Sequence, residues 1–306
     1  SAASDVYKRQ IPEFGTKFVR GMLVDTRPTT FDELIRISGL SHGTDVWLGN
    51  AQTLIEEGTV PLQDAICCRD DIMIYLIKMG LEPNKAFKIM ETVRKGKALK
   101  DPDKWEGFKS AMKEKDVPDW YVKSCEKIKY MFPKAHAAAY VTNAFRIAWF
   151  KVHKPKAYYT AYFTIRADEF DSDIMCHGKE KVLNKMKEID LAGNNATTKD
   201  KNMYAILELV LEMYERGINF LPMALYKSHS TKFIAEEDGI RPPLNSIPGL
   251  GTVAAEGICK AKEDGEFMCI DELRMRAKVG SSVVELLRSA GCLKGMPESN
   301  QMSLFA

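Results

Sequence analysis

The residues best suited to chemistry lie between Lys127 and Tyr140, where three lysines lead into an alanine-rich segment with helical character. Pro133 suits the first helical position, and the unpaired amides after it, at the positive end of the helix dipole, favour a bound phosphate. His136 and Tyr140 are four residues apart and therefore share a face. The pattern is typical of a nucleotide site. A buried helix with a satisfied histidine and a solvated lysine cluster is the alternative.

Positive charge is concentrated around this segment. The 306-residue chain has a formal net charge of +2, yet residues 85–156 carry 18 Lys or Arg against 8 Asp or Glu. Cations with interleaved aromatic rings favour a surface that follows phosphates and stacks bases, whereas a solvated lysine-rich surface is the alternative. The interleaved rings are Tyr121, Tyr130, Phe132, Tyr140 and Trp149.

A second motif, in residues 247–255, has the pattern of a helix-hairpin-helix turn. Glycine at two positions permits positive backbone dihedrals and lets main-chain N–H groups approach a phosphate. Such contacts do not read sequence, so the motif predicts binding to the backbone of any duplex. The predicted DNA contacts are Gly249, Leu250, Gly251, Thr252, Lys260 and Lys262. Residues 279–283 are either a second, degenerate hairpin or an ordinary helix N-cap.

Metal-binding patterns are weak in this chain. The carboxylates of Asp70 and Asp71 point apart on a predicted helix, and those of residues 168–173 fall at a natural capping position. Seven cysteines show no C-x-x-C spacing, so we expect no zinc and no disulfides. No apolar run approaches the length of a membrane span, and we expect a cytoplasmic protein.

Hydrophobic periodicity predicts a mainly α fold in which capping and breaking residues place the helices. Thr30 and Glu33 form a capping box, and Gly39 should end that helix. A hairpin at residues 231–233 is the only place where strands are expected. The predicted helices span residues 30–39, 64–78, 83–94, 105–115, 118–131, 133–153, 155–163, 174–189 and 199–216.

Several runs of residues carry a resemblance to a known family. They are Pro12-Glu13-Phe14-Gly15-Thr16-Lys17-Phe18, Gly39-Leu40-Ser41-His42-Gly43-Thr44-Asp45-Val46-Trp47-Leu48-Gly49-Asn50, Cys68-Arg69-Asp70-Asp71-Ile72-Met73 and Tyr158-Tyr159-Thr160-Ala161-Tyr162-Phe163. From about Pro12 to Phe305 the chain resembles the PolC-type branch of the family C bacterial replicative DNA polymerases. The alanine-rich helix is similar to the nucleotide-binding helix of that family's fingers domain.

The resemblance implies a C-terminal fragment built from successive parts. Residues 1–10 fit neither the family nor a helix and are interpreted as a non-native leader. The remaining parts are the end of the palm (11–25), the fingers domain (26–171), a helical connection (172–241), a helix-hairpin-helix duplex-binding domain (242–295) and a tail (296–306). In the family, palm aspartates that precede this region hold Mg²⁺. We therefore expect no catalytic residue, no bound metal and no DNA synthesis from this chain alone.

The resemblance also implies roles for single residues around the alanine-rich helix. Lys129, Lys134 and His136 are expected to contact the triphosphate of an incoming dNTP. Tyr140 is expected to stack near the nascent base pair. The supporting charges are Arg69, Arg94 and Lys95.

The end of the chain resembles a bacterial sliding-clamp peptide. Leu304 and Phe305 are expected to enter an apolar pocket of the clamp while Gln301 makes polar contacts at its rim. The implied partners are primer-template DNA, dNTP, the sliding clamp and other replisome subunits, with no membrane. Two alternatives are a helix-hairpin-helix DNA-binding or scaffolding protein without a nucleotide site, and a clamp-recruited DNA-repair factor.

Overall fold

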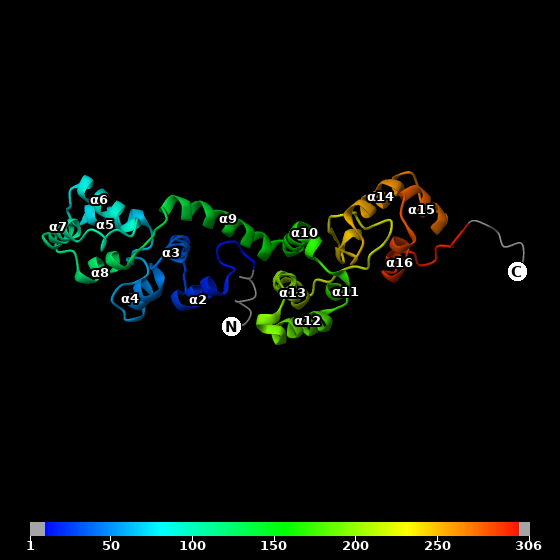
Figure 1. The fold of residues 1–306 in the computed structure, drawn as a ribbon, viewed down its shortest axis with the longest axis horizontal. Coiled ribbons are helices and arrows are strands. Elements are labelled where there is room, and N and C mark those ends of the chain that lie inside the picture. Colours follow the sequence, from blue (N-terminus) through cyan, green and yellow to red (C-terminus); the bar gives the residue numbers. More distant parts are fainter. Residues whose placement is uncertain (1–9, 300–306) are drawn as a thin grey trace, which may run out of the picture. The chain divides into compact units, whose positions relative to one another are not determined.

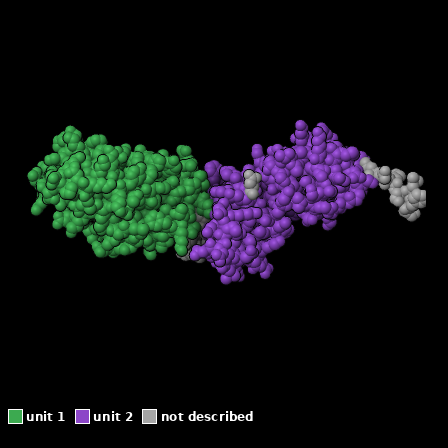
Figure 2. Space-filling view, viewed as in Figure 1, with its two compact units in different colours: residues 1–148 green, residues 149–306 purple. Residues whose placement is uncertain are grey.

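The computed structural model describes residues 10–299, apart from the side chain of Asp168. The chain divides into two compact units, Ser1–Ala148 and Trp149–Ala306 (Figure 2). Both units are built mainly from α-helices, which confirms the predicted fold class (Figure 1).

The first unit contains the helices α2 to α8 and the greater part of α9. The segment Trp47–Ala51 leads into α4 and is kinked, because Leu48 and Gly49 do not have helical dihedrals. The helices are α2 (Lys17–Thr26), α3 (Phe31–His42), α4 (Gln52–Glu56), α5 (Arg69–Lys78), α6 (Pro83–Arg94), α7 (Pro102–Lys113), α8 (Asp119–Lys127) and α9 (Lys134–His153).

Helix α3 begins as its sequence predicts. The Thr30 hydroxyl accepts the N–H of Glu33 at 3.3 Å, and the Glu33 carboxylate accepts the N–H of Thr30 at 2.9 Å, which confirms the capping box. The predicted end at Gly39 was wrong, because α3 continues to His42. A Cβ at Gly39 would lie 2.5 Å from the sulfur of Cys68. The glycine therefore serves a close contact between chain segments and does not terminate the helix.

Helix α5 begins five residues later than the predicted 64–78. Its start is fixed by Asp71, whose carboxylate accepts the N–H groups of Cys67 and Cys68 at 3.1 and 2.9 Å. Such a cap satisfies the amides that a helix start leaves unpaired. Gly80, with a φ of 91°, follows the end of α5 as predicted.

The core of the first unit includes the interface between α5 and α6. Ile72 and Leu76 of α5 and Ile89 of α6 are fully buried there. Helix α8 joins this core through Tyr121, whose ring stacks on that of Tyr75 with 4.2 Å between centroids. The packed helices give the loops between them a fixed frame.

The second unit is helical except for one small antiparallel sheet. Strands β1 and β2 pair Ile234 with Arg241 and Glu236 with Gly239. Its elements are α10 (Pro155–Ile165), α11 (Ser172–Met175), α12 (Lys179–Ala192), α13 (Thr198–Glu215), β1 (Ile234–Glu236), β2 (Gly239–Arg241), α14 (Thr252–Glu263), α15 (Ile270–Ala277) and α16 (Ser281–Ser289), with short 3₁₀ turns at Ala167–Glu169, Gly193–Asn195 and Leu244–Ser246.

The predicted positions of one helix and of the strands in this unit were wrong. The helix expected over 174–189 is broken after α11, because Gly178 takes a φ of 96° before α12 begins. The strands lie at 234–241, a few residues beyond the expected 231–233. There Ile240 exchanges main-chain hydrogen bonds with Asn219 and Leu221, so β2 is also held by the segment that follows α13.

A buried ion pair joins the end of α9 to α13. The Lys151 ammonium lies 2.9 Å from the Glu212 carboxylate, and each side chain is only 1% exposed. The Tyr159 hydroxyl donates to the same carboxylate at 2.5 Å. Burial raises the pKa of Glu212 while the Lys151 charge opposes that rise.

The last part of the second unit has a hydrophobic core of its own. Helices α14, α15 and α16 enclose it together with residues that precede α14. Its fully buried members include Leu244, Ala255, Ile258, Leu273 and Leu287. This core fixes the loops that lead into α14 and α16.

Candidate nucleotide and duplex contacts

The main chain that leads into α9 is held on both sides. The Lys129 N–H donates to the Thr44 carbonyl at 3.0 Å, and the Thr44 N–H donates to the Tyr130 carbonyl at 2.9 Å. The Arg69 N–H donates to the Phe132 carbonyl at 3.1 Å. Thr44 follows α3 and Arg69 opens α5, so two elements distant in sequence position the start of α9.

The loop after α6 approaches the same main chain. Gly96 has a φ of 62°, and a Cβ on it would lie 2.6 Å from the Lys129 carbonyl oxygen. Only glycine permits both that dihedral and that approach. Arg94 ends α6 and Lys95 is its C-cap, so both directly precede the glycine that makes this contact.

The N-terminus of α9 differs from the prediction in two respects. The helix begins at Lys134, so Pro133 precedes it and is not its first residue. The Lys134 N–H, which was expected to be unpaired, donates to the Asp70 carboxylate at 2.6 Å. A carboxylate of the protein thus already uses part of the attraction that this helix end has for anions.

A column of rings rises from the start of α9. The Phe132 and His136 rings stack with centroids 4.9 Å apart, and the His136 and Tyr140 centroids are 4.6 Å apart. His136 is exposed and Tyr140 is 51% exposed. The alternative of a buried, satisfied histidine is therefore wrong. We call Phe132, His136 and Tyr140 the ring column.

The cations near the ring column are paired with carboxylates. The Lys129 ammonium lies 2.5 Å from Asp45. Glu91 receives hydrogen bonds from Arg94 and Lys95, which lower the pKa of its carboxyl to about 2. These pairs hold three predicted phosphate ligands at the surface. A bound polyphosphate would have to replace the carboxylates.

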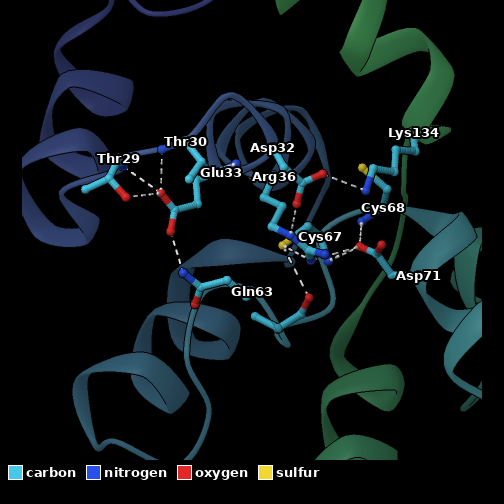
Figure 3. A network of polar contacts seen from close by, with 11 residues as sticks. Thr29, Thr30, Asp32, Glu33, Arg36, Gln63, Cys67, Cys68, Asp71 and Lys134 are labelled. Atoms are coloured by element: carbon cyan, nitrogen blue, oxygen red, sulfur yellow. Dashed lines mark hydrogen bonds and ion pairs between the residues drawn. The ribbon is translucent and has the colours of Figure 1, made fainter.

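Lys134 belongs to a wider polar network (Figure 3). Its ammonium lies 2.9 Å from one oxygen of Asp32, and the other oxygen of Asp32 accepts a hydrogen bond from Arg36 at 2.9 Å. Arg36 also lies 3.8 Å from Asp71, which caps α5. The hydrogen bond from Lys134 is the main reason that the pKa of Asp32 is lowered. The network links α3, the cap of α5 and the start of α9.

Only one of the two glycines of the predicted hairpin has a positive φ; the expectation was wrong for Gly251, whose backbone is extended with φ of −70° and ψ of 155°. Gly249 takes a φ of 86°, Leu250 is buried, and Gly251 is the N-cap of α14. A Cβ on Gly251 would meet nothing within 4 Å. The space beside Gly251 and the first amides of α14 is therefore open to a ligand.

The segment before α16 repeats this backbone without the first glycine. Lys278 has a φ of 54°, Val279 is buried, and Gly280 is the N-cap of α16. Lys278, Val279 and Gly280 correspond in order to Gly249, Leu250 and Gly251. The two interpretations of residues 279–283 therefore coexist, since the N-cap belongs to a degenerate hairpin.

A cleft of about 390 Å³ opens against the first hairpin. Lys199 and Met203 of α13 line it opposite the hairpin, and Glu169 and Asp171 add negative charge. The Asn245 side-chain oxygen, at its edge, is buried without a hydrogen-bond partner.

The two predicted lysines of α14 differ in their surroundings. The Lys262 ammonium donates to the carbonyl oxygens of Ser228 and Leu225 at 2.7 and 3.2 Å, so it supports the loop before β1. We therefore leave Lys262 out of the proposed DNA contacts. Lys260 is exposed and is not engaged in this way.

Two family models match parts of this chain. The family model described as bacterial DNA polymerase III alpha subunit finger domain matches residues 4–116, and a helix-hairpin-helix motif matches residues 217–303. The DNA polymerase III PolC-type of Clostridium perfringens is 57% identical over 96% of this chain, and that of Bacillus subtilis is also 57% identical over 96%. The Caldanaerobacter subterraneus protein of the same name is 56% identical over 96% of the chain.

The chain belongs to the PolC-type DNA polymerase III family. It spans about a fifth of the length of these relatives, 20% of the Clostridium protein and 21% of the Caldanaerobacter protein. In this PolC-type segment, four predicted nucleotide ligands gather at the start of α9: Lys129, Lys134, His136 and Tyr140. Arg69 joins them through its main chain, and Arg94 and Lys95 through the Gly96 contact.

Several residues of these sites were missed from the sequence. Asp32 and Asp70 neutralise Lys134 and the start of α9, but they are separated from Lys134 by 102 and 64 residues. Asn245 and Lys199 come together at the hairpin cleft only through the fold. Lys278 had a local signal, because it precedes Val279-Gly280-Ser281, which matches Leu250-Gly251-Thr252 of the first hairpin in residue type.

The described part of this PolC-type segment contains neither a metal-binding cluster nor a membrane-spanning helix. Among residues 10–299, no group of three His, Cys, Asp or Glu side chains is arranged to hold a metal ion. No helix within that range is long and apolar enough to cross a membrane. The seven cysteines are free thiols. The predicted clamp residues Gln301, Leu304 and Phe305 lie outside the described residues.

Proposed function

We propose that this chain supplies the fingers and duplex-binding parts of a bacterial replicative DNA polymerase, which adds dNTPs to a primer 3′-hydroxyl and releases pyrophosphate. The observation that carries the proposal is the exposed ring column, which begins beside a cluster of cations. A base can lie against Tyr140 while its triphosphate reaches Lys134 and Lys129. The identity to PolC-type polymerases over 96% of the chain supports this assignment.

In this reaction the primer oxygen attacks the α-phosphate, and negative charge grows on the departing pyrophosphate. The role of this chain is to position the triphosphate and offset that charge. Lys129, Lys134 and His136 would do so from the α9 side, and Arg94 and Lys95 from α6. Arg69 is a further supporting charge at the start of α5.

Polymerases of this kind use divalent ions, and we propose Mg²⁺ for the longer polypeptide. The described residues do not form a site for it. From the family resemblance we assign the metal to palm aspartates outside this chain, and we expect the isolated chain to bind substrates without synthesising DNA. In the cell we place the polymerase in the cytoplasm.

The two hairpins are proposed to bind the sugar-phosphate backbone of duplex DNA. The Leu250 N–H is used within the loop, where it donates to the Ile247 carbonyl at 3.0 Å. The amides of the first residues of α14, with the Thr252 hydroxyl, can approach a phosphate beside the open face of Gly251. Leu250 anchors the loop from within the core. Lys260 can add charge along the same helix. Binding of this kind is independent of base sequence.

The C-terminal tail is proposed to recruit a bacterial sliding clamp through Gln301, Leu304 and Phe305, with other replisome subunits nearby. A titration of the clamp with the intact chain and with a chain lacking residues 301–306 tests this. Micromolar binding that is abolished on truncation supports the proposal. Equal binding by both chains, or no binding, removes the tail from it.

The nucleotide site is tested with Tyr140→Ala in a full-length PolC-type polymerase. Base stacking on an aromatic ring contributes about 1–3 kcal/mol, so the KM for dNTP should rise about tenfold or more. Phe87→Ala, at an exposed ring of α6, is the matched control. An unchanged KM in Tyr140→Ala would remove this residue from the pocket.

A further inference from the structure

Both hydrogen-bonding groups of Lys134 face carboxylates from other elements. Its main-chain N–H donates to Asp70 of α5 at 2.6 Å, and its ammonium lies 2.9 Å from Asp32 of α3. A residue proposed to bind phosphate is thus bracketed by two negative charges in the free protein (Figure 3 shows Asp32 and Lys134).

The two carboxylates are held in different ways. Asp70 binds a main-chain group, so removing it would uncap the start of α9. Asp32 binds the end of a flexible side chain at the surface, where the Asp32 side chain is 51% exposed and that of Lys134 is 35% exposed. An ion pair of this kind is weak and exchanges readily. Only the Asp32 contact can therefore open while α9 stays in place.

Asp32 has a second partner that keeps it in position. Its other oxygen accepts the Arg36 Nε–H at 2.9 Å, and the Arg36 side chain is only 15% exposed. Arg36 is itself fixed near Asp71, which caps α5. When Lys134 turns away, Asp32 stays beside Arg36. It then remains within reach of the returning ammonium.

We propose that Asp32 is the resting partner of Lys134 and competes with an incoming polyphosphate for its ammonium. The inference rests on the proposed nucleotide site and adds a residue that tunes it. Lys134 exchanges the Asp32 carboxylate for phosphate oxygens when a dNTP binds. It returns to Asp32 when pyrophosphate leaves. Asp32 thereby weakens ground-state binding and assists product release without touching the substrate.

The test compares variants of the 306-residue chain by calorimetric titration with Mg²⁺–dNTP and, separately, with pyrophosphate. Asp32→Asn keeps an oxygen for Arg36 and removes the competing charge. It should bind both ligands about two- to fivefold more tightly, the range expected for a surface ion pair. Asp103→Asn is the matched control, because Asp103 is the exposed second residue of α7 as Asp32 is the second residue of α3. It should leave both affinities unchanged.

A double-mutant cycle separates competition from a general charge effect. Lys134→Ala should weaken binding, and Asp32→Asn should add nothing in that background because the ammonium for which Asp32 competes is gone. Thermal melts of all variants show that the comparison is made between folded proteins.

The outcomes distinguish the inference from the function on which it rests. If the wild type binds dNTP and Lys134→Ala weakens it, but Asp32→Asn binds no more tightly, the resting-partner role is wrong and the nucleotide site stands. A gain from Asp32→Asn that persists in the Lys134→Ala background also overturns that role. If neither the wild type nor any variant binds dNTP or pyrophosphate, the nucleotide site itself fails, and the inference fails with it.

Discussion

The proposed phosphate contacts at the start of α9 and at the hairpin before α14 are built in opposite ways. Around α9 they are long cationic side chains, and Lys134, Lys129 and Lys95 are held by Asp32, Asp45 and Glu91. At the hairpin they are main-chain amides at the start of α14, behind a loop whose geometry is set by the positive φ of Gly249. The first arrangement suits a substrate that must bind and leave at every cycle. The second suits the sugar-phosphate backbone of duplex DNA, along which the protein moves without reading the bases.

Backbone strain at the hairpin should give the largest effect. Gly249→Val places a β-branched residue at a φ of 86°, which such residues tolerate poorly. Duplex affinity should fall at least tenfold, whereas the slope of log K against log salt should stay nearly constant, because main-chain amides carry no net charge and neutralise no phosphate. Fluorescence anisotropy over a salt series measures both quantities.

Gly291→Val is the control for this strain. Gly291 has a φ of 78° in the loop after α16, and its Cβ position is open. The variant should be less stable but keep its duplex affinity. A duplex affinity left unchanged by Gly249→Val would mean that the hairpin does not touch phosphate.

At the start of α9, dNTP affinity should depend on the charge of single side chains and not on the backbone. Lys134→Met removes one charge-assisted interaction, so dNTP affinity should fall about tenfold while duplex affinity stays constant. Lys123→Met, on the exposed side of α8, is the control. Weaker duplex binding in Lys134→Met with no change in dNTP binding would mean that this lysine contacts DNA. The proposed difference between the α9 site and the hairpin would then be wrong.

A smaller effect should come from the degenerate hairpin. Lys278→Gly relieves a left-handed conformation that costs a non-glycine residue about 1 kcal/mol, so the free energy of unfolding should rise by about that amount. If the Lys278 ammonium contacts DNA, duplex affinity should fall in the same variant. Denaturant melts measure the free energy of unfolding, and duplex titrations measure the affinity for DNA. A Lys278→Gly chain that is less stable would show that the loop is not strained.

The smallest expected effect is a change in the pH dependence of stability when Glu91 is replaced. Hydrogen bonds from Arg94 and Lys95 lower the pKa of Glu91 to about 2 from its ordinary value of 4.5, so this carboxylate stabilises the fold above pH 4.5. The contribution disappears as the pH falls toward 2. Glu91→Gln should lower the melting temperature slightly at pH 7, and the difference from wild type should vanish near pH 2. A difference that is constant with pH would point to packing instead of charge.

Local signals in the sequence were sufficient for most helices and for the hairpin. The Thr30 cap, the turn at Gly249 and the Gly251 N-cap act over a few residues, so their patterns could be read directly. Errors arose where a distant segment decides the outcome. Gly39 looked like a helix end because glycine often is one, yet it lies in mid-helix to admit Cys68.

The same difference between local patterns and distant contacts explains which parts of the candidate nucleotide site could be predicted. The ring column follows from a four-residue spacing within one helix, and its stacking was foreseeable. The carboxylates that hold Lys134 come from α3 and α5, and no local pattern connects them with α9. The sequence therefore indicates which groups are candidates for binding a nucleotide, whereas the fold shows which carboxylates hold those groups.

The buried pair of Lys151 and Glu212 has a consequence for how this sequence can change over time. The two positions are 61 residues apart, yet each charge is neutralised in the interior by the other. Replacing one alone would strand a charge in a nonpolar environment, and Tyr159 would be left without its acceptor if Glu212 were replaced. Substitutions at these sites should consequently be inherited as a pair, so that lineages carry either both charges or two uncharged residues.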